Sequence, residues 1–339
     1  MALFPAVGRS GRLRLSKGVV TTVLVVGVAL HLFPFAYLVS LTLQTPQDAQ
    51  SLTPTFIPSE VDWSAWQLMW TVAISSDVPE EFRFIQLPFW RYFLNSLFIA
   101  VVTLLLSLPV TALAAYANSK LQRGRGARSS FLFFIGTLMV PFAVVLVPTF
   151  LLVKSFPFAL PRAPVVGGER LPTLNMFDTP WGVILPAVFV PFSFLLFKGF
   201  FDTIPDSVIQ AARVDGGSEF NIFRRIVLPM SVPVFAVAAY TGFASVWDNF
   251  LWQILVLRSP ENSTTSVTIY GLLNSFFRSG AATPQGAEAQ SAVLRQIQDA
   301  GLNWNGLMVL GLLQTLPIFV AFLITRRYLL RGIRIRGLK

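Results

Sequence analysis

Toward the end of the fifth apolar segment of the chain, several side chains could together bind a polar ligand. They are two tryptophans, one carboxylate and two amides: Trp247, Asp248, Asn249, Trp252 and Gln253. Aromatic faces stack on the C–H groups of a ring, and amides and carboxylates hydrogen bond hydroxyl groups. An ionisable group within an apolar segment is costly and points to function. The alternative is that Asp248 lies at the outer end of a helix or pairs with a neighbouring subunit.

Other kinds of chemistry lack the residues they need. The chain has no cysteine, which excludes disulfides and thiolate metal sites, and His31 is its only histidine. We expect His31 to pack between helices or to face a cavity. None of the lysines stands in the Gly-x-x-x-x-Gly-Lys-Ser/Thr pattern that cradles ATP phosphates. We therefore predict no catalytic residue, metal or cofactor in this chain, and any ATP-derived energy must come from another subunit.

A second pattern lies between the fourth and fifth apolar segments and predicts two short helices. Thr203 followed by Pro205 and Asp206 reads as a capping box, so a helix is expected from about Pro205 to Val214. The pair Gly216-Gly217 supplies the left-handed backbone that ends a helix. Ser218 can then cap a second helix through Arg225, and Leu228-Pro229 closes the segment.

The apolar residues of these two helices allow two interpretations. They are Val208, Ala211, Ala212, Phe220, Phe223 and Ile226. A lipid-lying amphipathic helix is one possibility. The small side chains of Ala211 and Ala212 favour the other, because they let a partner protein approach closely.

The elements that must position these residues are membrane-spanning helices. The chain of 339 residues is 54% hydrophobic and only 12% charged, which is too little polar surface for a soluble globule. A spanning helix needs roughly 20 apolar residues. Six such runs occur, at residues 19–43, 93–119, 129–153, 181–201, 229–257 and 307–328.

The first run is longer than the apolar core of a signal peptide and lacks a small-residue cleavage site, so we interpret it as a retained anchor. Prolines within the later runs free backbone carbonyls and can bend helices, which suits a bundle that opens alternately to each side but is also common in static kinks. They are Pro109, Pro141, Pro148, Pro186, Pro191, Pro229 and Pro233.

The distribution of charge predicts the orientation of the chain. Most of the 26 lysines and arginines fall before the first run, after the last run, and in the second-to-third and fourth-to-fifth connections. Most of the 16 acidic residues fall on the other side. The positive-inside rule therefore places both termini in the cytoplasm, and it accounts for the formal net charge of +10 without a nucleic-acid partner.

The residues between the fourth and fifth runs resemble the EAA loop of ABC importer permeases, which reads Glu-Ala-Ala, then Gly, then Ile-x-Leu-Pro. The matching residues are Gln210-Ala211-Ala212, Asp215-Gly216 and Ile226-Val227-Leu228-Pro229. Residues 92–96, 114–117, 247–252 and 327–332, with Pro141 and Pro148, are similar to the carbohydrate, maltose-type branch. The resemblance covers nearly the whole chain from the first run onward. It implies an all-α integral membrane protein with the type I ABC importer permease fold: six transmembrane helices, both termini inside and a cytoplasmic coupling helix.

The resemblance also implies a function and partners. The chain would be the permease subunit of an ATP-driven, binding-protein-dependent sugar importer of the oligosaccharide or α-glucoside type, working by alternating access. It would pair with a second homologous permease, two copies of an ATPase that bind ATP and Mg²⁺, and an extracytoplasmic sugar-binding protein. The residues implied in ATPase coupling are Gln210, Ala211, Ala212, Asp215, Gly216, Phe220, Leu228 and Pro229. Gln210 departs from the family's glutamate and offers only an uncharged hydrogen bond.

The predicted organisation follows from these segments. Residues 1–18 form a cytoplasmic segment, 19–43 the first span, 44–92 an outer loop, 93–328 the permease core and 329–339 a cytoplasmic tail. Within the core, 202–229 is the coupling loop and 258–305 an outer loop whose stretch 279–299 is longer than is usual in the family. The expected location is the bacterial inner membrane, in contact with lipid. Two alternatives are a secondary transporter, which needs buried charge pairs and inverted repeats, and a membrane-embedded enzyme, which needs convergent catalytic residues.

Overall fold

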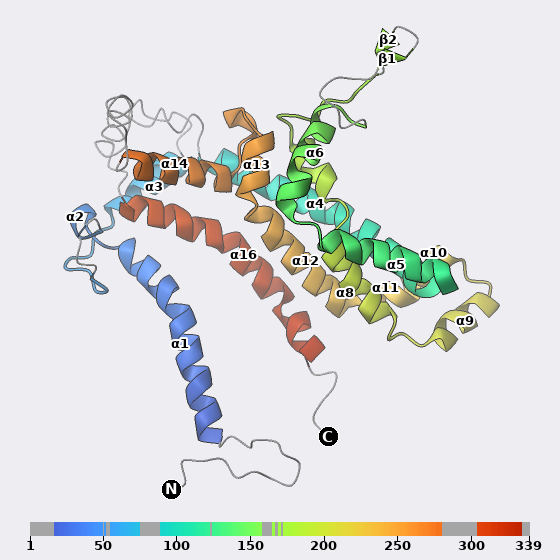
Figure 1. Ribbon diagram of the computed structural model, residues 1–339. Coiled ribbons are helices and arrows are strands. Elements are labelled where there is room, and N and C mark those ends of the chain that lie inside the picture. The colour runs from blue at the N-terminus through green and yellow to red at the C-terminus, as the bar shows by residue number, and fades with distance from the viewer. Residues whose placement is uncertain are drawn as a thin grey trace.

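The computed structural model describes residues 17–49, 51, 55–74, 89–122, 124–157, 165–166, 169–170, 172–279 and 304–333. Most of these residues are helical (Figure 1). Residues 1–16 of the predicted N-terminal segment, most of the long stretch 279–299 and the last six residues of the predicted tail lie outside the described residues.

Four helices of the described chain are each long and apolar enough to cross a membrane. They are α1 (Lys17–Leu41), α4 (Phe89–Tyr116) with its π-helical continuation η2 (Ala117–Leu121), the run α7 (Pro180–Ile184), η3 (Leu185–Ala187) and α8 (Pro191–Phe201), and α16 (Trp304–Ile333). They correspond to the first, second, fourth and sixth predicted runs. The count reaches six only if each of two bent helix pairs is one span.

The third predicted run is not one continuous helix. It consists of α5 (Gly124–Leu138) and α6 (Phe142–Lys154), whose axes differ by 100°. Pro141 is the cause, because proline disfavours helical backbone in the residue before it and cannot donate a hydrogen bond itself. Its own ψ of 140° is extended, and α6 begins directly after it. Pro148 lies inside α6 without ending it.

The fifth predicted run is also interrupted. Its main helix is α12 (Val232–Trp247), which is preceded by α10 (Glu219–Ile222), η4 (Phe223–Val227) and α11 (Leu228–Met230) after a bend of 81°. At its other end, Asp248 and Asn249 separate α12 from α13 (Phe250–Val256). The polar residues singled out in the sequence therefore lie at and around a helix break.

Phenylalanines hold the bundle together where α4, α8 and α10 meet. Phe194, Phe197 and Phe201 of α8 are fully buried and pack with Tyr116 and Phe223. The rings of Tyr116 and Phe223 are 5.3 Å apart, and each such aromatic pair contributes about 0.5–1.5 kcal/mol beyond its buried area. Neighbouring helix α12 packs against α4 on one side and α16 on the other.

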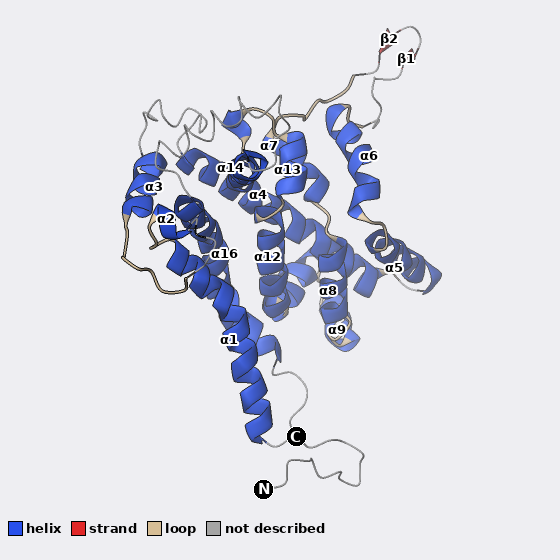
Figure 2. Cartoon of the chain, turned by 60° about the vertical axis from the view of Figure 1, so that its left-hand side comes forward, coloured by secondary structure: helices blue, strands red, loops and turns tan. Residues whose placement is uncertain are grey.

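The remaining helices lie toward one end of the bundle, and the strand pair projects away from it (Figure 2). They are α2 (Pro46–Ala49), α3 (Ser64–Ile74), the antiparallel pair β1 (Val165–Val166) and β2 (Glu169–Arg170), η5 (Pro260–Asn262) and α14 (Thr265–Ser279). Ala65 and Met69 of α3 are buried against Leu307 and Leu310 of α16. The predicted outer loops thus contain helices that cap the bundle, which the sequence analysis did not foresee.

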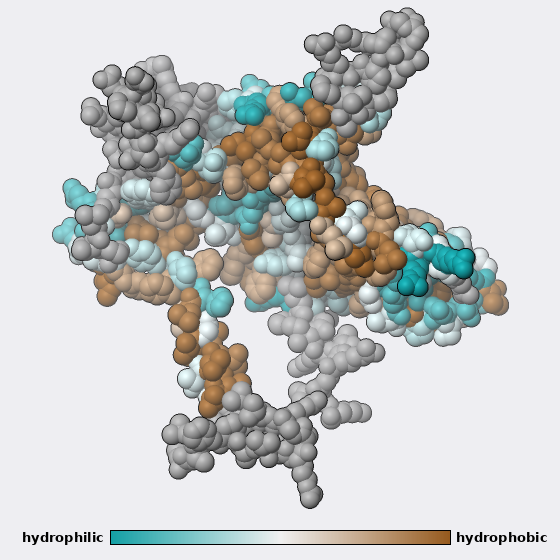
Figure 3. All heavy atoms as spheres, viewed as in Figure 1, coloured by the Kyte–Doolittle hydropathy of each residue, from teal (hydrophilic) through white to brown (hydrophobic). Residues whose placement is uncertain are grey.

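Helix α1 stands apart from the other helices except α16 (Figure 1). Large apolar side chains on it, such as Val23, Leu24 and Leu30, are more than 60% exposed, and the face of the helix seen in Figure 3 is mainly hydrophobic. An exposed apolar helix of this length fits a lipid or protein-lined membrane environment. His31 lies on it and hydrogen bonds the Gly27 carbonyl oxygen at 2.7 Å.

Candidate functional site

The first predicted short helix is α9, which spans Asp206–Val214 and lies at one end of the molecule (Figure 1). The predicted capping box at its start is wrong. Pro205 is the N-cap and no side chain caps the helix. The Thr203 hydroxyl instead donates to the Phe200 carbonyl at 2.6 Å, because Thr203 belongs to the turn that closes α8. The Asp206 carboxylate forms an ion pair with Lys120 of η2, at 2.7 Å.

The predicted end of α9 is confirmed and has the geometry of a Schellman motif. Gly216 has φ of +80°, which glycine adopts without strain. Its N–H donates to the Arg213 carbonyl at 3.0 Å, and the Gly217 N–H donates to the Ala212 carbonyl at 2.9 Å. A Cβ on Gly217 would lie 2.8 Å from that same carbonyl oxygen. Both glycines are therefore required, one for its backbone angle and one for close approach.

The second short helix begins as predicted and continues further. Ser218 is the N-cap of α10, and its hydroxyl accepts from the Asn221 N–H at 3.4 Å. Helical structure then runs through η4 and α11 to Met230. Leu228 and Pro229 do not end it, since proline near the start of a helical turn needs no N–H partner. The chain turns only at Ser231.

The apolar residues of this hairpin divide into an inward and an outward set. Ile209, Ile222 and Phe223 are buried against the bundle, and of these only Phe223 was in the predicted set. The outward set is Val208, Val214 and Phe220, which are 37%, 87% and 63% exposed. Figure 3 shows that this end of the molecule is mostly hydrophilic, so these exposed apolar side chains are candidates for contact with a protein partner.

The residues expected to couple to an ATPase are accessible. Gln210, Ala211, Asp215, Gly216, Phe220, Leu228 and Pro229 are exposed, and Ala212 is half-buried. Apart from Leu228 and Pro229, they lie on α9, the turn after it or the first residues of α10. Their role in coupling stays a prediction.

Arg213 and Glu219 hold the turn between α9 and α10 in place. The Arg213 Nε donates to the Glu219 carboxylate at 2.6 Å, and the Tyr116 hydroxyl donates to the other oxygen of that carboxylate at 2.8 Å. The hydrogen bond from Arg213 lowers the pKa of Glu219 below its ordinary value, and the bond from Tyr116 adds to this effect.

The five residues expected to contact a ligand occupy different environments. Trp247 is 1% exposed, donates its indole N–H to the Gln314 carbonyl at 2.9 Å and stacks on Phe243. Gln253 is buried; it donates to the Val246 carbonyl at 2.8 Å and accepts hydrogen bonds from two hydroxyls, those of Thr264 and Ser266. Trp252 is buried as well. Asp248 is exposed and Asn249 is partly exposed.

Asn249 lines two adjoining cavities beside the helix break. One has a volume of about 220 Å³ and lies between α4, α8 and α12. The other, of about 340 Å³, lies between α6, α7, α12 and α13 and also touches Trp252 and Gln253. Both are lined by Ala187, Val246 and Asn249.

The cavities present hydroxyl groups that the sequence analysis missed. They come from Thr103, Ser107, Thr149, Ser193, Thr241 and Ser245. Thr103 and Ser107 are four residues apart on α4, as are Thr241 and Ser245 on α12, so each pair shares a helix face. The Thr103 hydroxyl is buried and has no hydrogen-bond partner among the described residues. Two hydroxyl-bearing residues four positions apart within an apolar run can be seen in the sequence. This pattern could have predicted the polar lining of the cavities.

Comparison with known proteins shows which family the chain matches. Residues 113–335 match the family described as "Binding-protein-dependent transport system inner membrane component". The chain is 28% identical over 313 residues to the sn-glycerol-3-phosphate transport system permease protein UgpE of Escherichia coli (strain K12), covering 92% of this chain and 94% of that protein. It is 27% identical over 251 residues to the arabinooligosaccharides transport system permease protein AraQ of Halalkalibacterium halodurans, covering 74% and 75%.

A solved structure shares the fold. It is described as a bacterial ABC transporter involved in the import of the acidic polysaccharide alginate, and one of its chains matches with a TM-score of 0.66 at 19% identity, covering 94% of this chain and 100% of that one. The family match extends over the EAA-like residues and confirms the predicted resemblance to ABC importer permeases. The chain belongs to the family of binding-protein-dependent transport system inner membrane components, as a non-catalytic permease subunit of an ABC transporter whose ATP is hydrolysed by a separate ATPase.

Proposed function

We propose that this chain is one of the two membrane subunits of an importer that takes up a sugar by alternating access. It receives the sugar from an extracytoplasmic binding protein, and two copies of an ATPase, which hold ATP and Mg²⁺, supply the energy. The chain itself binds no cofactor. It crosses the membrane six times, with both termini and α9 in the cytoplasm.

The observation that carries this proposal is the outward surface of α9. Val214 is 87% exposed on a helix whose end is fixed by a Schellman motif and by the Arg213–Glu219 ion pair. A short helix with a fixed end and exposed apolar side chains can seat in a groove of a separate motor and transmit its movement. The coupling residues predicted from the EAA resemblance, Gln210, Ala211, Ala212, Asp215, Gly216, Phe220, Leu228 and Pro229, are accessible for this contact.

The orientation is supported by the arrangement of the helix ends. The start of α1 and the end of α16 lie toward the same end of the molecule as α9 (Figure 1). Basic residues of the described chain at that end include Lys120, Lys198 and Arg213. Positive charge concentrates on the cytoplasmic side of membrane proteins, which supports an inside position for this end.

The cavities around Asn249 favour a hydroxylated substrate. Serine and threonine hydroxyls and an amide can exchange hydrogen bonds with sugar hydroxyls as these pass. A relative named for arabinooligosaccharide transport agrees with an oligosaccharide. The narrower choice of an α-glucoside rests on the resemblance to maltose-type subunits. The proposed pathway also includes four residues at the same helix break. Trp252 and Gln253 line the larger cavity, and Trp247 and Asp248 lie at the end of α12.

The test is reconstitution of the chain with its partner permease, the ATPase and the binding protein in proteoliposomes. We expect uptake of a labelled oligosaccharide that requires ATP and the binding protein. Parallel assays with α-glucosides, arabinooligosaccharides, sn-glycerol-3-phosphate and alginate oligomers identify the substrate. Transport by the chain alone, without a bound ATPase, would contradict the proposal and indicate a secondary transporter.

A further inference from the structure

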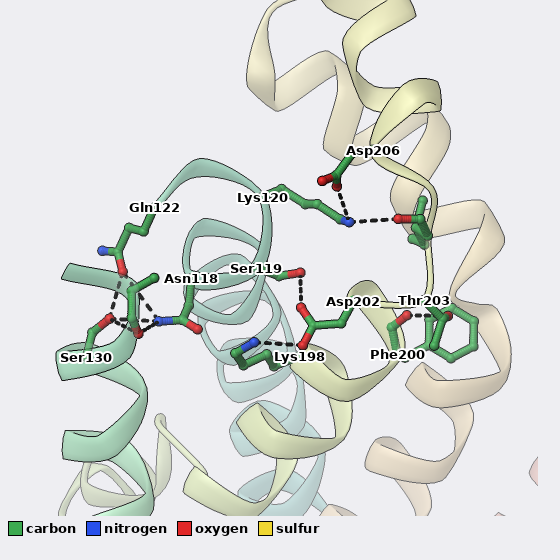
Figure 4. A network of polar contacts seen from close by, with 12 residues as sticks. Asn118, Ser119, Lys120, Gln122, Ser130, Lys198, Phe200, Asp202, Thr203 and Asp206 are labelled. Atoms are coloured by element: carbon green, nitrogen blue, oxygen red, sulfur yellow. Dashed lines mark hydrogen bonds and ion pairs between the residues drawn. The ribbon is translucent and has the colours of Figure 1, made fainter. Parts of the chain in front are cut away.

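The cytoplasmic end of α4 carries a lysine whose charge is almost completely buried. The side chain of Lys120, in η2, is 5% exposed. Its ammonium donates to the Ile204 carbonyl and to the Asp206 carboxylate, both at 2.7 Å (Figure 4). Burying a charged group is costly unless it is paired and hydrogen bonded. Lys120 therefore ties the end of α4 to the start of α9.

The far end of α9 is tied to the same turn of α4. Tyr116 lies four residues before Lys120, and its hydroxyl donates to Glu219 at 2.8 Å. Arg213 donates to Glu219 at 2.6 Å and, through Nη2, to the Lys120 carbonyl at 3.3 Å. One turn of α4 thus holds both ends of a helix that is separated from it by more than eighty residues of sequence.

A neighbouring contact joins the end of α4 to the end of α8, outside α9. The Ser119 hydroxyl donates to the Asp202 carboxylate at 2.6 Å, and the other oxygen of that carboxylate accepts from Lys198 at 2.7 Å (Figure 4). The Tyr116 ring packs on Phe201 and Phe223, on either side of α9 in sequence. The end of α4 is therefore fixed by polar and aromatic contacts together.

We propose that Tyr116, Lys120, Asp206, Arg213 and Glu219, here called the α4–α9 clamp, make α4 move with α9 as one rigid body. The inference rests on the proposed function, in which an ATPase displaces α9. Without the clamp, that displacement would reach the bundle through the apolar packing of Ile209 and through α8 and α10, which are joined to α9 along the chain. The clamp passes it directly to α4 as well.

The clamp connects the motor surface to the proposed pathway. Helix α4 supplies Thr103 and Ser107 to the cavity beside Asn249. A rigid rotation or shift of α4 changes the position of these hydroxyls relative to those on α8 and α12. The clamp residues are positioning residues, because they act through α4 and do not touch the substrate.

The experiment measures the number of ATP molecules hydrolysed per sugar imported by the reconstituted full complex. Lys120→Met and Tyr116→Phe are expected to raise this ratio by about fivefold or more, which is the lower range of typical coupling between sites. Stimulation of ATP hydrolysis by the binding protein is expected to fall in parallel. Lys198→Met is the matched control, because its ion pair with Asp202 is equally short but lies within the end of α8.

A mutant cycle separates coupling from folding. Tyr116→Phe and Glu219→Gln are nearly isosteric, so both are expected to assemble even where Lys120→Met does not. Both variants act on the Glu219 carboxylate, because Tyr116→Phe removes one of its donors and Glu219→Gln removes its charge and one of its two acceptor oxygens. Their effects on the ratio are therefore expected to be less than additive in the double variant. Variants that assemble but hydrolyse the wild-type number of ATP molecules per imported sugar would contradict the proposed role of the clamp. A wild-type complex without ATP-dependent import would overturn the proposed function itself, and the clamp with it.

Discussion

Thr103 is the residue at which the proposed pathway is most open to test. Its hydroxyl is buried at the cavity shared by α4, α8 and α12 and has no partner among the described residues. An unsatisfied buried hydroxyl costs about 1–3 kcal/mol, so the Thr103 hydroxyl would gain from a hydrogen-bond partner that enters the cavity. In the proposed function that partner is a passing sugar hydroxyl.

Thr103→Val removes this hydroxyl while keeping the shape of the side chain. We expect KM for sugar import to rise by about 2- to 10-fold, the equivalent of one net hydrogen bond, with assembly unchanged or improved. Import by the reconstituted complex measures the change. Thr111→Val on the same helix is the control, since Thr111 is equally buried but accepts a hydrogen bond from the Val190 N–H. An unchanged KM in the Thr103 variant would remove this hydroxyl from the pathway.

Individual side chains show what the sequence could not reveal. Trp247 and Gln253 are polar residues in an apolar run, which made them candidates for ligand contact. Their hydrogen bonds are satisfied by Gln314, Thr264 and Ser266, at positions 11 to 67 residues away. Gly216 was predictable because the need for a left-handed residue at a helix end is local.

At the scale of elements, local signals placed the helices well but not their breaks. The end of α9 followed from two adjacent glycines. In the third run, Pro141 and Pro148 look alike in sequence, yet only Pro141 separates two helices, by 100°. Local sequence does not distinguish a proline that ends a helix from one that neighbouring packing tolerates.

The turn between α9 and α10 is expected to weaken in acid. The pKa of Glu219 is lowered in the folded protein, so its ion pair with Arg213 stabilises the fold above the ordinary glutamate pKa of about 4.3 and is lost as the pH falls through the lower folded value. Both side chains are partly exposed, so the contribution is at most about 1 kcal/mol. Thermal unfolding of the detergent-solubilised protein between neutral and acid pH measures it. Glu219→Gln should be less stable than wild type at neutral pH and equal to it in acid; a constant difference would contradict the assignment.

At the scale of the whole molecule, the family and the helical membrane fold were predictable from composition and a short motif. The six apolar runs and the EAA-like residues led to the family that residues 113–335 match. The helices that cap the end of the bundle opposite α9, α3 and α14, were not predicted, because their burial depends on α16, which is more than two hundred residues from α3.

The orientation can be tested in a chain that has no cysteine of its own. Thr173 and Ser207 are both exposed, at opposite ends of the described bundle. In right-side-out vesicles, a membrane-impermeant maleimide is expected to label a Thr173→Cys variant but not a Ser207→Cys variant. Inverted vesicles should give the reverse, because charge asymmetry places α9 inside. Labelling of Ser207→Cys from the outside would contradict the orientation and remove α9 from the reach of any cytoplasmic motor.

The exposed apolar side chains near the end of α9 also affect how the cell must produce this protein. In the proposed function, Val214 and Phe220 leave apolar surface in contact with water until a motor subunit covers it. Exposed apolar patches of this kind promote aggregation and attract proteases. Subunits made in excess of the motor would therefore aggregate or be degraded. Assembly of the transporter thus requires balanced production of its subunits.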